Sequence, residues 1–190
     1  MPTSTPEDLA LLRGLLRGPA GWWSSARLRV LADGGLLPPG AARLVVRRPL
    51  MGVPAGVRVE DAGGRVLVRG LADGVDAAGL RPLLDPLALA TGLPPAPGAL
   101  PPRERREAAD RLELLAAEAL DVDGVPAVRG LLAPRPGPAG GPGAVVGPTA
   151  LLLDRASGLP LRAGPQDEEA LLALVLEELD PRLDDDVFGA

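Results

Sequence analysis

The chain has 190 residues and a net charge of −5, with 25 acidic residues against 20 basic ones. That length is enough for one domain with a substantial core and too short for two large domains. The sequence contains no His and no Cys, which excludes a histidine general base, a cysteine nucleophile and disulfide bonds. A zinc site would need carboxylate ligands alone, which is rare. We therefore expect a protein that is not an enzyme, with no catalytic residues, no metal and no cofactor.

The acidic excess is spread along the chain, which argues against a nucleic-acid partner because nucleic-acid binding needs a basic face. A small arginine cluster (Arg103, Arg105, Arg106) lies among acidic residues and predicts a solvated face. No apolar run is long enough for a transmembrane segment. At the N-terminus, acidic residues come first and arginines interrupt the apolar run, unlike a signal peptide. These features predict a cytoplasmic location.

Residues 6–17 have the pattern of a short amphipathic helix. Thr5 is a suitable N-cap, Pro6 suits the first helical position, and Asp8 stands at the third position of a capping box. Gly18 and the proline after it end the pattern. The residues that fall on one face are Leu9, Leu12 and Leu16.

Alternating apolar and charged residues then predict strands over 26–32 and 42–48, followed by a hairpin. The two hairpin strands are 57–60 and 65–69, and the Asp-Ala-Gly-Gly sequence at 61–64 supplies the turn. Valines alternate with charged residues in both strands. One face of this sheet is therefore expected to be apolar and the other wet and charged.

Several middle and late segments leave alternatives open. Residues 75–92 fit two short helical turns interrupted by prolines, and the Pro-rich stretch 93–102 predicts a loop. Residues 103–120 contain strong helix formers, but a helix that turns into a strand near Glu113 also fits them. The tail 166–179 fits both a helix and a buried strand.

The segments between these ambiguous stretches have clearer patterns. Residues 125–133 and 144–153 predict two strands that flank a Pro/Gly-rich loop at 134–143. A turn at 154–158 and a further strand at 159–163 follow. If the two flanking strands pair antiparallel, they belong to the same sheet as the earlier hairpin.

The stretch 121–162 ends in the motif Asp-x-x-x-Gly-Leu-Pro-Leu-Arg, from Asp154 to Arg162. In that motif Gly158 suits a positive φ, and Pro160 fixes the start of the next strand. This motif and the segment order resemble the LolA-like fold family, which includes the outer-membrane lipoprotein carrier LolA, the sigma-factor regulator MucB and an uncharacterised actinobacterial branch. The other shared features are a strand ending at Arg48-Pro49, Val57–Glu60 with Gly64–Val66, Leu83–Pro86, Val122–Ala127 and the acidic close Asp184–Phe188.

The resemblance implies a single domain over residues 1–190 with an α+β fold: a curved antiparallel sheet (half-barrel) with helices packed on the concave side. Family members hold acyl chains or a partner protein in that concavity and often work outside the cytoplasm. The resemblance therefore implies a non-enzymatic binding module that holds an apolar lipid or acyl ligand. The alternative is a cytoplasmic regulatory domain that binds a protein partner, as the sigma-factor regulators do.

Trp22 and Trp23 are the candidate ligand-binding residues, because Trp is enriched where an apolar surface meets a wet one. The alternative for this pair is that one ring packs in the core and the other covers the helix end. The run Asp184–Asp186 lacks the spacing of a calcium loop and predicts a solvated acidic tail. Asp154 and Ser157 are expected to cap the turn and to have no role in chemistry.

Overall fold

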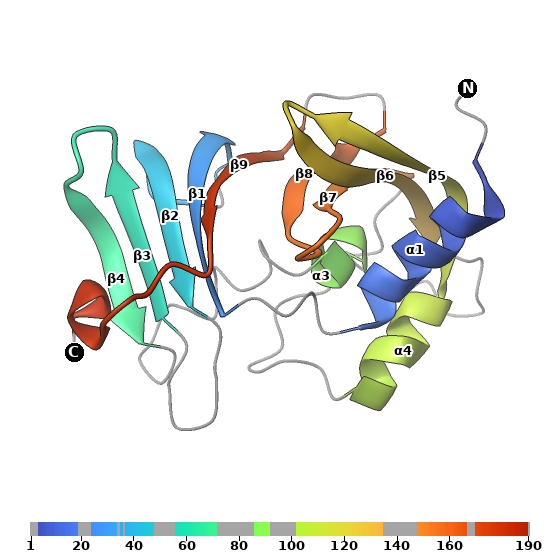
Figure 1. The fold of residues 1–190 in the computed structure, drawn as a ribbon, viewed down its shortest axis with the longest axis horizontal. Coiled ribbons are helices and arrows are strands. Elements are labelled where there is room, and N and C mark those ends of the chain that lie inside the picture. The colour runs from blue at the N-terminus through green and yellow to red at the C-terminus, as the bar shows by residue number, and fades with distance from the viewer. Residues whose placement is uncertain are drawn as a thin grey trace.

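The computed structural model describes residues 4–18, 24–33, 35, 37–47, 56–71, 86–91, 102–134, 148–166 and 170–189. Its main feature is one open antiparallel sheet of nine strands in the order β4-β3-β2-β1-β9-β8-β7-β6-β5 (Figure 1). The strands are β1 (Ser25–Ala32), β2 (Ala41–Arg47), β3 (Gly56–Asp61), β4 (Val66–Leu71), β5 (Leu112–Val122), β6 (Val125–Pro134), β7 (Thr149–Asp154), β8 (Pro160–Pro165) and β9 (Leu172–Leu179). The helices are α1 (Pro6–Arg17), α3 (Pro86–Thr91), α4 (Pro102–Asp110) and the short 3₁₀ helix η2 (Asp185–Phe188). The predicted antiparallel sheet with helices, an α+β arrangement, is confirmed.

The N-terminal helix is the one the sequence predicts. The Thr5 side chain accepts a hydrogen bond from the Asp8 N–H (3.1 Å), and the Asp8 carboxylate accepts from the Thr5 N–H (3.4 Å), so the capping box is complete. Pro6 is the first helical residue and Arg17 the last. Leu12 and Leu16 are buried on the face that packs against the sheet.

The predicted hairpins are also confirmed. β3 pairs with β4 around the Asp61 turn, whose carboxylate accepts from the Gly63 and Arg65 N–H groups (2.9 and 3.0 Å). β6 pairs antiparallel with β7, from Ala127 opposite Asp154 to Leu132 opposite Thr149. The strand predicted over 144–153 is observed from 149 onward, and its first residues, 144–147, lie outside the described part of the chain.

Two of the open alternatives are settled by the structure. Residues 103–120 are a helix followed by a strand, since α4 ends at Asp110 and β5 begins at Leu112. The tail forms the strand β9, because Leu172 and Leu174 complete the apolar core and the strand pairs with β1. Of the segment 75–92, residues 86–91 form α3. Most of the two predicted Pro/Gly-rich loops, 93–102 and 134–143, lies outside the described residues, although Pro102 begins α4 and Pro134 ends β6.

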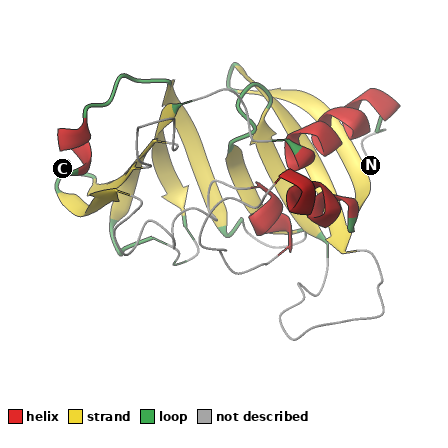
Figure 2. Ribbon diagram, turned by 90° about the horizontal axis from the view of Figure 1, so that it is seen from below, coloured by secondary structure: helices red, strands yellow, loops and turns green. Residues whose placement is uncertain are grey.

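The three longer helices pack on one face of the sheet, which we call the core face. α1 lies against β5 and β6, α3 against β6, β7 and β8, and α4 against α1 and β5 (Figure 2). Gly130 of β6 allows the close approach of α1, because a Cβ at that position would lie 2.5 Å from Leu12 Cδ2. The helices therefore cover the β5–β8 half of this face.

Among the neighbouring strands of the sheet, β8 and β9 share the shortest paired stretch. Their register is limited to Arg162 with Ala173 and Ala163 with Leu172. By contrast, β9 pairs with β1 along residues Ala26 to Ala32 of β1, and the register of this pairing shifts after Arg27 and after Val30. Figure 1 shows that β8 and β9 separate toward the C-terminal end of β9. The sheet therefore consists of two meanders, β1–β4 and β5–β8, and β9 joins them.

Candidate functional site

The core face is apolar in strands of both halves of the sheet. Most of its central side chains are fully buried and belong to one hydrophobic cluster. They include Val59 of β3, Leu44 of β2, Leu28 of β1, Leu174 of β9, Leu151 of β7 and Val128 of β6, each at most 4% exposed. The contacts of α1, α3 and α4 are mainly with β5–β8. The β1–β3 and β9 part of the face is therefore apolar and buried, and the main contacts of these helices lie elsewhere.

The two tryptophans, Trp22 and Trp23, lie outside the described residues, but the structure shows how the chain is held on each side of them. Before the pair, the Arg105 guanidinium of α4 donates to the Gly18 carbonyl (2.8 Å). After the pair, the Ser24 hydroxyl and the Ser25 N–H donate to the Asp180 carboxylate (2.9 and 3.3 Å). The described residues on each side of the pair are thus held, Gly18 by α4 and Ser24–Ser25 by the residue that follows β9.

The same contact corrects one expectation from the sequence. Arg103 and Arg106 are exposed, as predicted, but Arg105 is only 9% exposed. Its guanidinium donates to the carbonyl of Gly18, the C-cap residue of α1, at a helix end where the last carbonyls have no partner within the helix. The alternation of arginine with glutamate in this segment cannot reveal this role, because the partner carbonyl belongs to a distant part of the chain.

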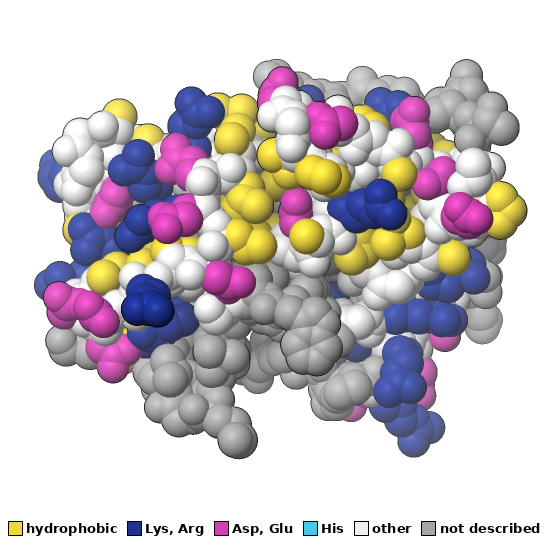
Figure 3. All heavy atoms as spheres, in the orientation of Figure 1, with side chains coloured by type: hydrophobic (Ala, Val, Ile, Leu, Met, Phe, Trp, Pro, Cys, Tyr) yellow, Lys and Arg dark blue, Asp and Glu magenta, His cyan; other side chains and the backbone are white. Residues whose placement is uncertain are grey.

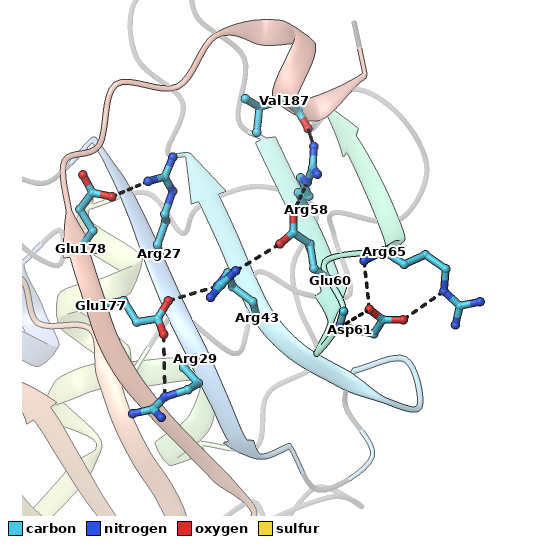
Figure 4. A network of polar contacts seen from close by, with 11 residues as sticks. Arg27, Arg29, Arg43, Arg58, Glu60, Asp61, Arg65, Glu177, Glu178 and Val187 are labelled. Carbon is cyan, nitrogen blue, oxygen red and sulfur yellow. Dashed lines mark hydrogen bonds and ion pairs between the residues drawn. The ribbon is translucent and has the colours of Figure 1, made fainter.

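The opposite face of the sheet, the outer face, carries a line of ion pairs over β9, β1, β2 and β3 (Figure 4). Glu177 lies between Arg29 (3.8 Å) and Arg43 (3.2 Å). Glu60 lies between Arg43 (3.7 Å) and Arg58 (2.6 Å). Because arginines and carboxylates alternate along this line, their charges largely neutralise one another.

The C-terminal segment is docked on the outer face beside these ion pairs. Phe188 is 1% exposed and packs on Gly56, where a Cβ would lie 2.6–2.8 Å from three of its ring atoms. The Arg47 guanidinium carbon lies 4.8 Å from the ring centroid and its Nη2 is 2.6 Å from Asp185 Oδ1. The predicted solvated acidic run is confirmed, since Asp184, Asp185 and Asp186 are exposed, and Phe188 beyond it is buried.

The β5–β8 half of the outer face carries a hydrophobic cluster, which we call the outer patch. Figure 3 shows hydrophobic side chains gathered over this half, in contrast to the charged β1–β4 half. The buried members of the outer patch are Ala127, Leu152 and Leu161, and the partly buried members are Leu120, Val122, Val125 and Leu176. Leu176 also packs against the core cluster, so it connects the two faces where β8 and β9 separate.

The turn motif that the sequence singles out is a structural element. Asp154 and Ser157 are buried at 4% and 1% exposure, and the Asp154 carboxylate accepts from the Ser157 N–H (2.6 Å). The Ser157 hydroxyl accepts from the Leu159 N–H (3.2 Å), and Gly158 has φ = 68°. These contacts confirm that both residues cap the turn.

Two carboxylates have lowered pKa values, and both are explained by local hydrogen bonds. The Arg65 N–H holds the pKa of Asp61 below its ordinary value, with a further contribution from the Gly63 N–H. The Ser24 N–H does the same for the pKa of Asp180. A carboxyl group that acts as a general acid near neutral pH needs a raised pKa, and both of these shifts are downward. Among the described residues, no group of three or more acidic side chains is placed to hold a metal ion.

No family model matches the chain, and no curated protein matches it. The likeness to the LolA-like family therefore stays an expectation from the sequence. Within the described part of the chain, none of the helices is long and apolar enough to cross a membrane.

Proposed function

We propose that this protein is a non-enzymatic binding module that holds an apolar ligand, such as a fatty acyl chain, against the core face of its sheet. In this proposal the core face is the concave side of a half-barrel. The observation that carries it is the apolar core face, which continues over β1–β3 and β9 while α1, α3 and α4 pack mainly on β5–β8. The chain also lacks His and Cys, which favours binding over catalysis.

The proposed ligand position is the β1–β3 part of the core face, lined by Leu28, Leu44 and Val59. These side chains are 0% exposed without a ligand, so an acyl chain would reach them by displacing the groups that now cover them. An acyl chain that packs there gains the free energy of apolar burial, about 0.8 kcal/mol for each buried methylene group. Trp22 and Trp23 are the proposed ligand-binding residues. The described residues that flank them, Gly18 and Ser24, contact Arg105 of α4 and Asp180 after β9.

The chain contains only these two tryptophans and no tyrosine, so intrinsic fluorescence reports on this segment alone. Titration of the full chain with the fluorescent fatty acid cis-parinaric acid should quench tryptophan emission saturably and sensitise the probe. Trp22→Phe and Trp23→Phe, measured separately, assign the effect to one ring. Absence of saturable binding to fatty acids, lysophospholipids and phospholipid vesicles would contradict the proposal.

Two adjacent residues of β2 supply a matched pair of variants. Leu44 lies on the core face at 0% exposure, and Val45 lies on the outer face at 4% exposure. Leu44→Ala should weaken probe binding by about tenfold, because about 1.4 kcal/mol of contact is lost, whereas Val45→Ala should leave it unchanged. Equal effects of the two substitutions would place the ligand elsewhere.

The alternative function, a regulatory domain that binds a protein partner, makes a different prediction. Affinity purification of the full chain from its native host should then yield one stoichiometric protein and no extractable lipid. Recovery of lipid without such a protein supports the binding module.

A further inference from the structure

The sheet has two edge strands, β4 and β5, and they differ in ways that decide which can accept another strand. β4 has six residues and includes Gly70 and the exposed Arg69. Short length and charge are common protections of a sheet edge. β5 has eleven residues, with neither proline nor a basic residue. Within the described part of the chain it is the last strand of the sheet, paired with β6 alone.

The register of the β5–β6 hairpin shows which backbone groups of β5 point outward. Asp123 (φ = 54°) and Gly124 (φ = 83°) form a two-residue turn closed by Val122 opposite Val125. The closing pair of such a turn exchanges hydrogen bonds, and exchange then recurs at every second pair. Leu120 and Val122 therefore bond to β6, while the N–H and C=O groups of Ala119 and Asp121 point away from the sheet.

The hydrogen bond from the Ala117 N–H to the Ser4 hydroxyl (2.9 Å) supports this assignment. Ala117 has the same parity as Ala119 and Asp121, so its N–H also points outward. Among the described residues, no partner occupies the outward backbone groups of Ala119 or Asp121. As far as the described residues show, the open part of the edge is therefore the stretch 118–122.

The charges in this stretch are already engaged within the chain. Glu118 forms an ion pair with Arg129 of β6. The Asp121 carboxylate accepts a hydrogen bond from the Gly124 N–H (2.7 Å) and supports the turn. Neither Glu118 nor Asp121 places a positive charge at the edge, which is a common protection against strand addition. The outward N–H and C=O groups of Ala119 and Asp121 therefore remain accessible to a new strand.

We propose that this edge is an interaction surface for a second copy of the chain, which adds its own β5 antiparallel about a twofold axis through Leu120. In this register the Ala119 N–H of each copy donates to the Asp121 carbonyl of the other, and the Asp121 N–H to the Ala119 carbonyl. A centre at Ala119 would need the Ala117 N–H that Ser4 already holds. A centre at Glu118 would place two carboxylates opposite each other.

The chosen register also joins the two outer patches. Leu120 and Val122 are partly buried members of the patch and point to the outer face. About the twofold axis, Leu120 meets Leu120 of the second copy, and Val122 lies opposite Glu118. The same backbone pairing thus buries apolar surface and satisfies outward polar groups, which is the combination that strand addition uses.

The absence of cysteine makes a direct test of register possible. Leu120→Cys would form a non-hydrogen-bonded pair with itself across the axis, with Cα atoms about 4.5 Å apart, within the range that a disulfide spans. Glu118→Cys is the matched control, because four residues of offset separate its two copies by about 14 Å. Under mild oxidation, Leu120→Cys should cross-link as a dimer and Glu118→Cys should not, while a mixture of Glu118→Cys and Val122→Cys should cross-link.

The unmodified chain should show a concentration-dependent dimer by sedimentation velocity between about 10 µM and about 1 mM, the range expected for a small interface. Ala119→Pro removes an outward N–H that β6 does not use, and edge positions tolerate proline. It should weaken the dimer at least about tenfold, because one hydrogen bond is lost at each of two symmetric positions. A monomer at every concentration, a dimer unaffected by Ala119→Pro, or equal cross-linking at 118 and 120 would overturn the proposal.

Discussion

The packing of Phe188 on Gly56 predicts a strong energetic coupling between the short helix η2, which ends at Phe188, and β3. A Cβ at position 56 would lie 2.6, 2.7 and 2.8 Å from the ring atoms Cγ, Cδ1 and Cδ2, whereas carbon atoms pack at about 3.5–4.0 Å. The ring would have to move by about 1 Å. It cannot move freely, because the Arg47 guanidinium lies 4.8 Å from the ring centroid.

The magnitudes follow from this geometry. Gly56→Ala should destabilise the protein by about 2 kcal/mol, within the usual range for an overpacked site. Phe188→Ala should cost about 3 kcal/mol, the lower end for a buried phenylalanine, because a chain terminus relaxes easily. In the double variant the added methyl group meets no ring, so the total should remain about 3 kcal/mol and not reach about 5 kcal/mol.

Equilibrium urea unfolding followed by far-UV circular dichroism measures the three free energies of unfolding. Chymotryptic cleavage after Phe188, read by intact mass, reports separately on undocking, and Gly56→Ala should accelerate it. Gly56 has no positive φ, so alanine brings no backbone strain that could imitate the effect. Additive free energies, within about 0.5 kcal/mol, would refute the reasoning.

Three further variants test other parts of the structure. Gly130→Ala should cost about 1–3 kcal/mol in urea unfolding, because its methyl group would contact the fully buried Leu12, and Leu12→Ala in the same chain should remove most of that penalty. Asp180→Asn keeps a hydrogen-bond acceptor but loses the charge. The pKa of Asp180 is lowered in the folded protein. The ionised carboxylate therefore stabilises the fold above the ordinary carboxyl range, and this stabilisation is lost as pH falls through the folded pKa. The thermal unfolding temperature of Asp180→Asn should consequently depend less on pH below about pH 4 than that of the unmodified chain. Glu60→Gln should lower the thermal unfolding temperature more than Glu178→Gln does, because the side chain of Glu60 is 12% exposed and that of Glu178 is 48% exposed. An equal or reversed order of the two variants would contradict this reasoning.

Local chemistry explains which parts of the fold the sequence predicts. The capping box at Thr5 and the turn at Asp61 depend on side chains and backbone groups within four residues of one another. The same holds for the Asp154 turn, where Ser157 and Gly158 lie within the motif itself. Such contacts form almost regardless of the distant fold, so short motifs predict them correctly.

The tail was ambiguous because its identity depends on distant partners. Leucines at 171, 174 and 179 with Val175 fit helical spacing as well as strand pairing. The strand is selected by the free edge of β1, to which β9 adds, and by the Asp180 carboxylate that receives the Ser24 and Ser25 donors. Tertiary context of this kind overrides local preference.

The contacts of Phe188 and Arg105 could not be predicted for the same reason. Phe188 needs a residue without a side chain opposite it, and Gly56 is far away in the sequence. Arg105 lies in a charged helix and finds the Gly18 carbonyl at the end of another helix. In both cases composition suggested a solvated segment, and only the packed structure shows a buried side chain.

The position of β9 links the order of folding to the proposed binding site. β1 and β9 lie at opposite ends of the sequence, so β1 remains an unpaired edge until the C-terminal strand is available. Pairing over such a separation is slow, because a long loop must close first. β9 also carries Leu174 of the core face and Leu176, which contacts both hydrophobic clusters. The strand that joins the two meanders therefore also completes the apolar wall, and a weakened β1–β9 pairing should impair stability and the proposed ligand binding together.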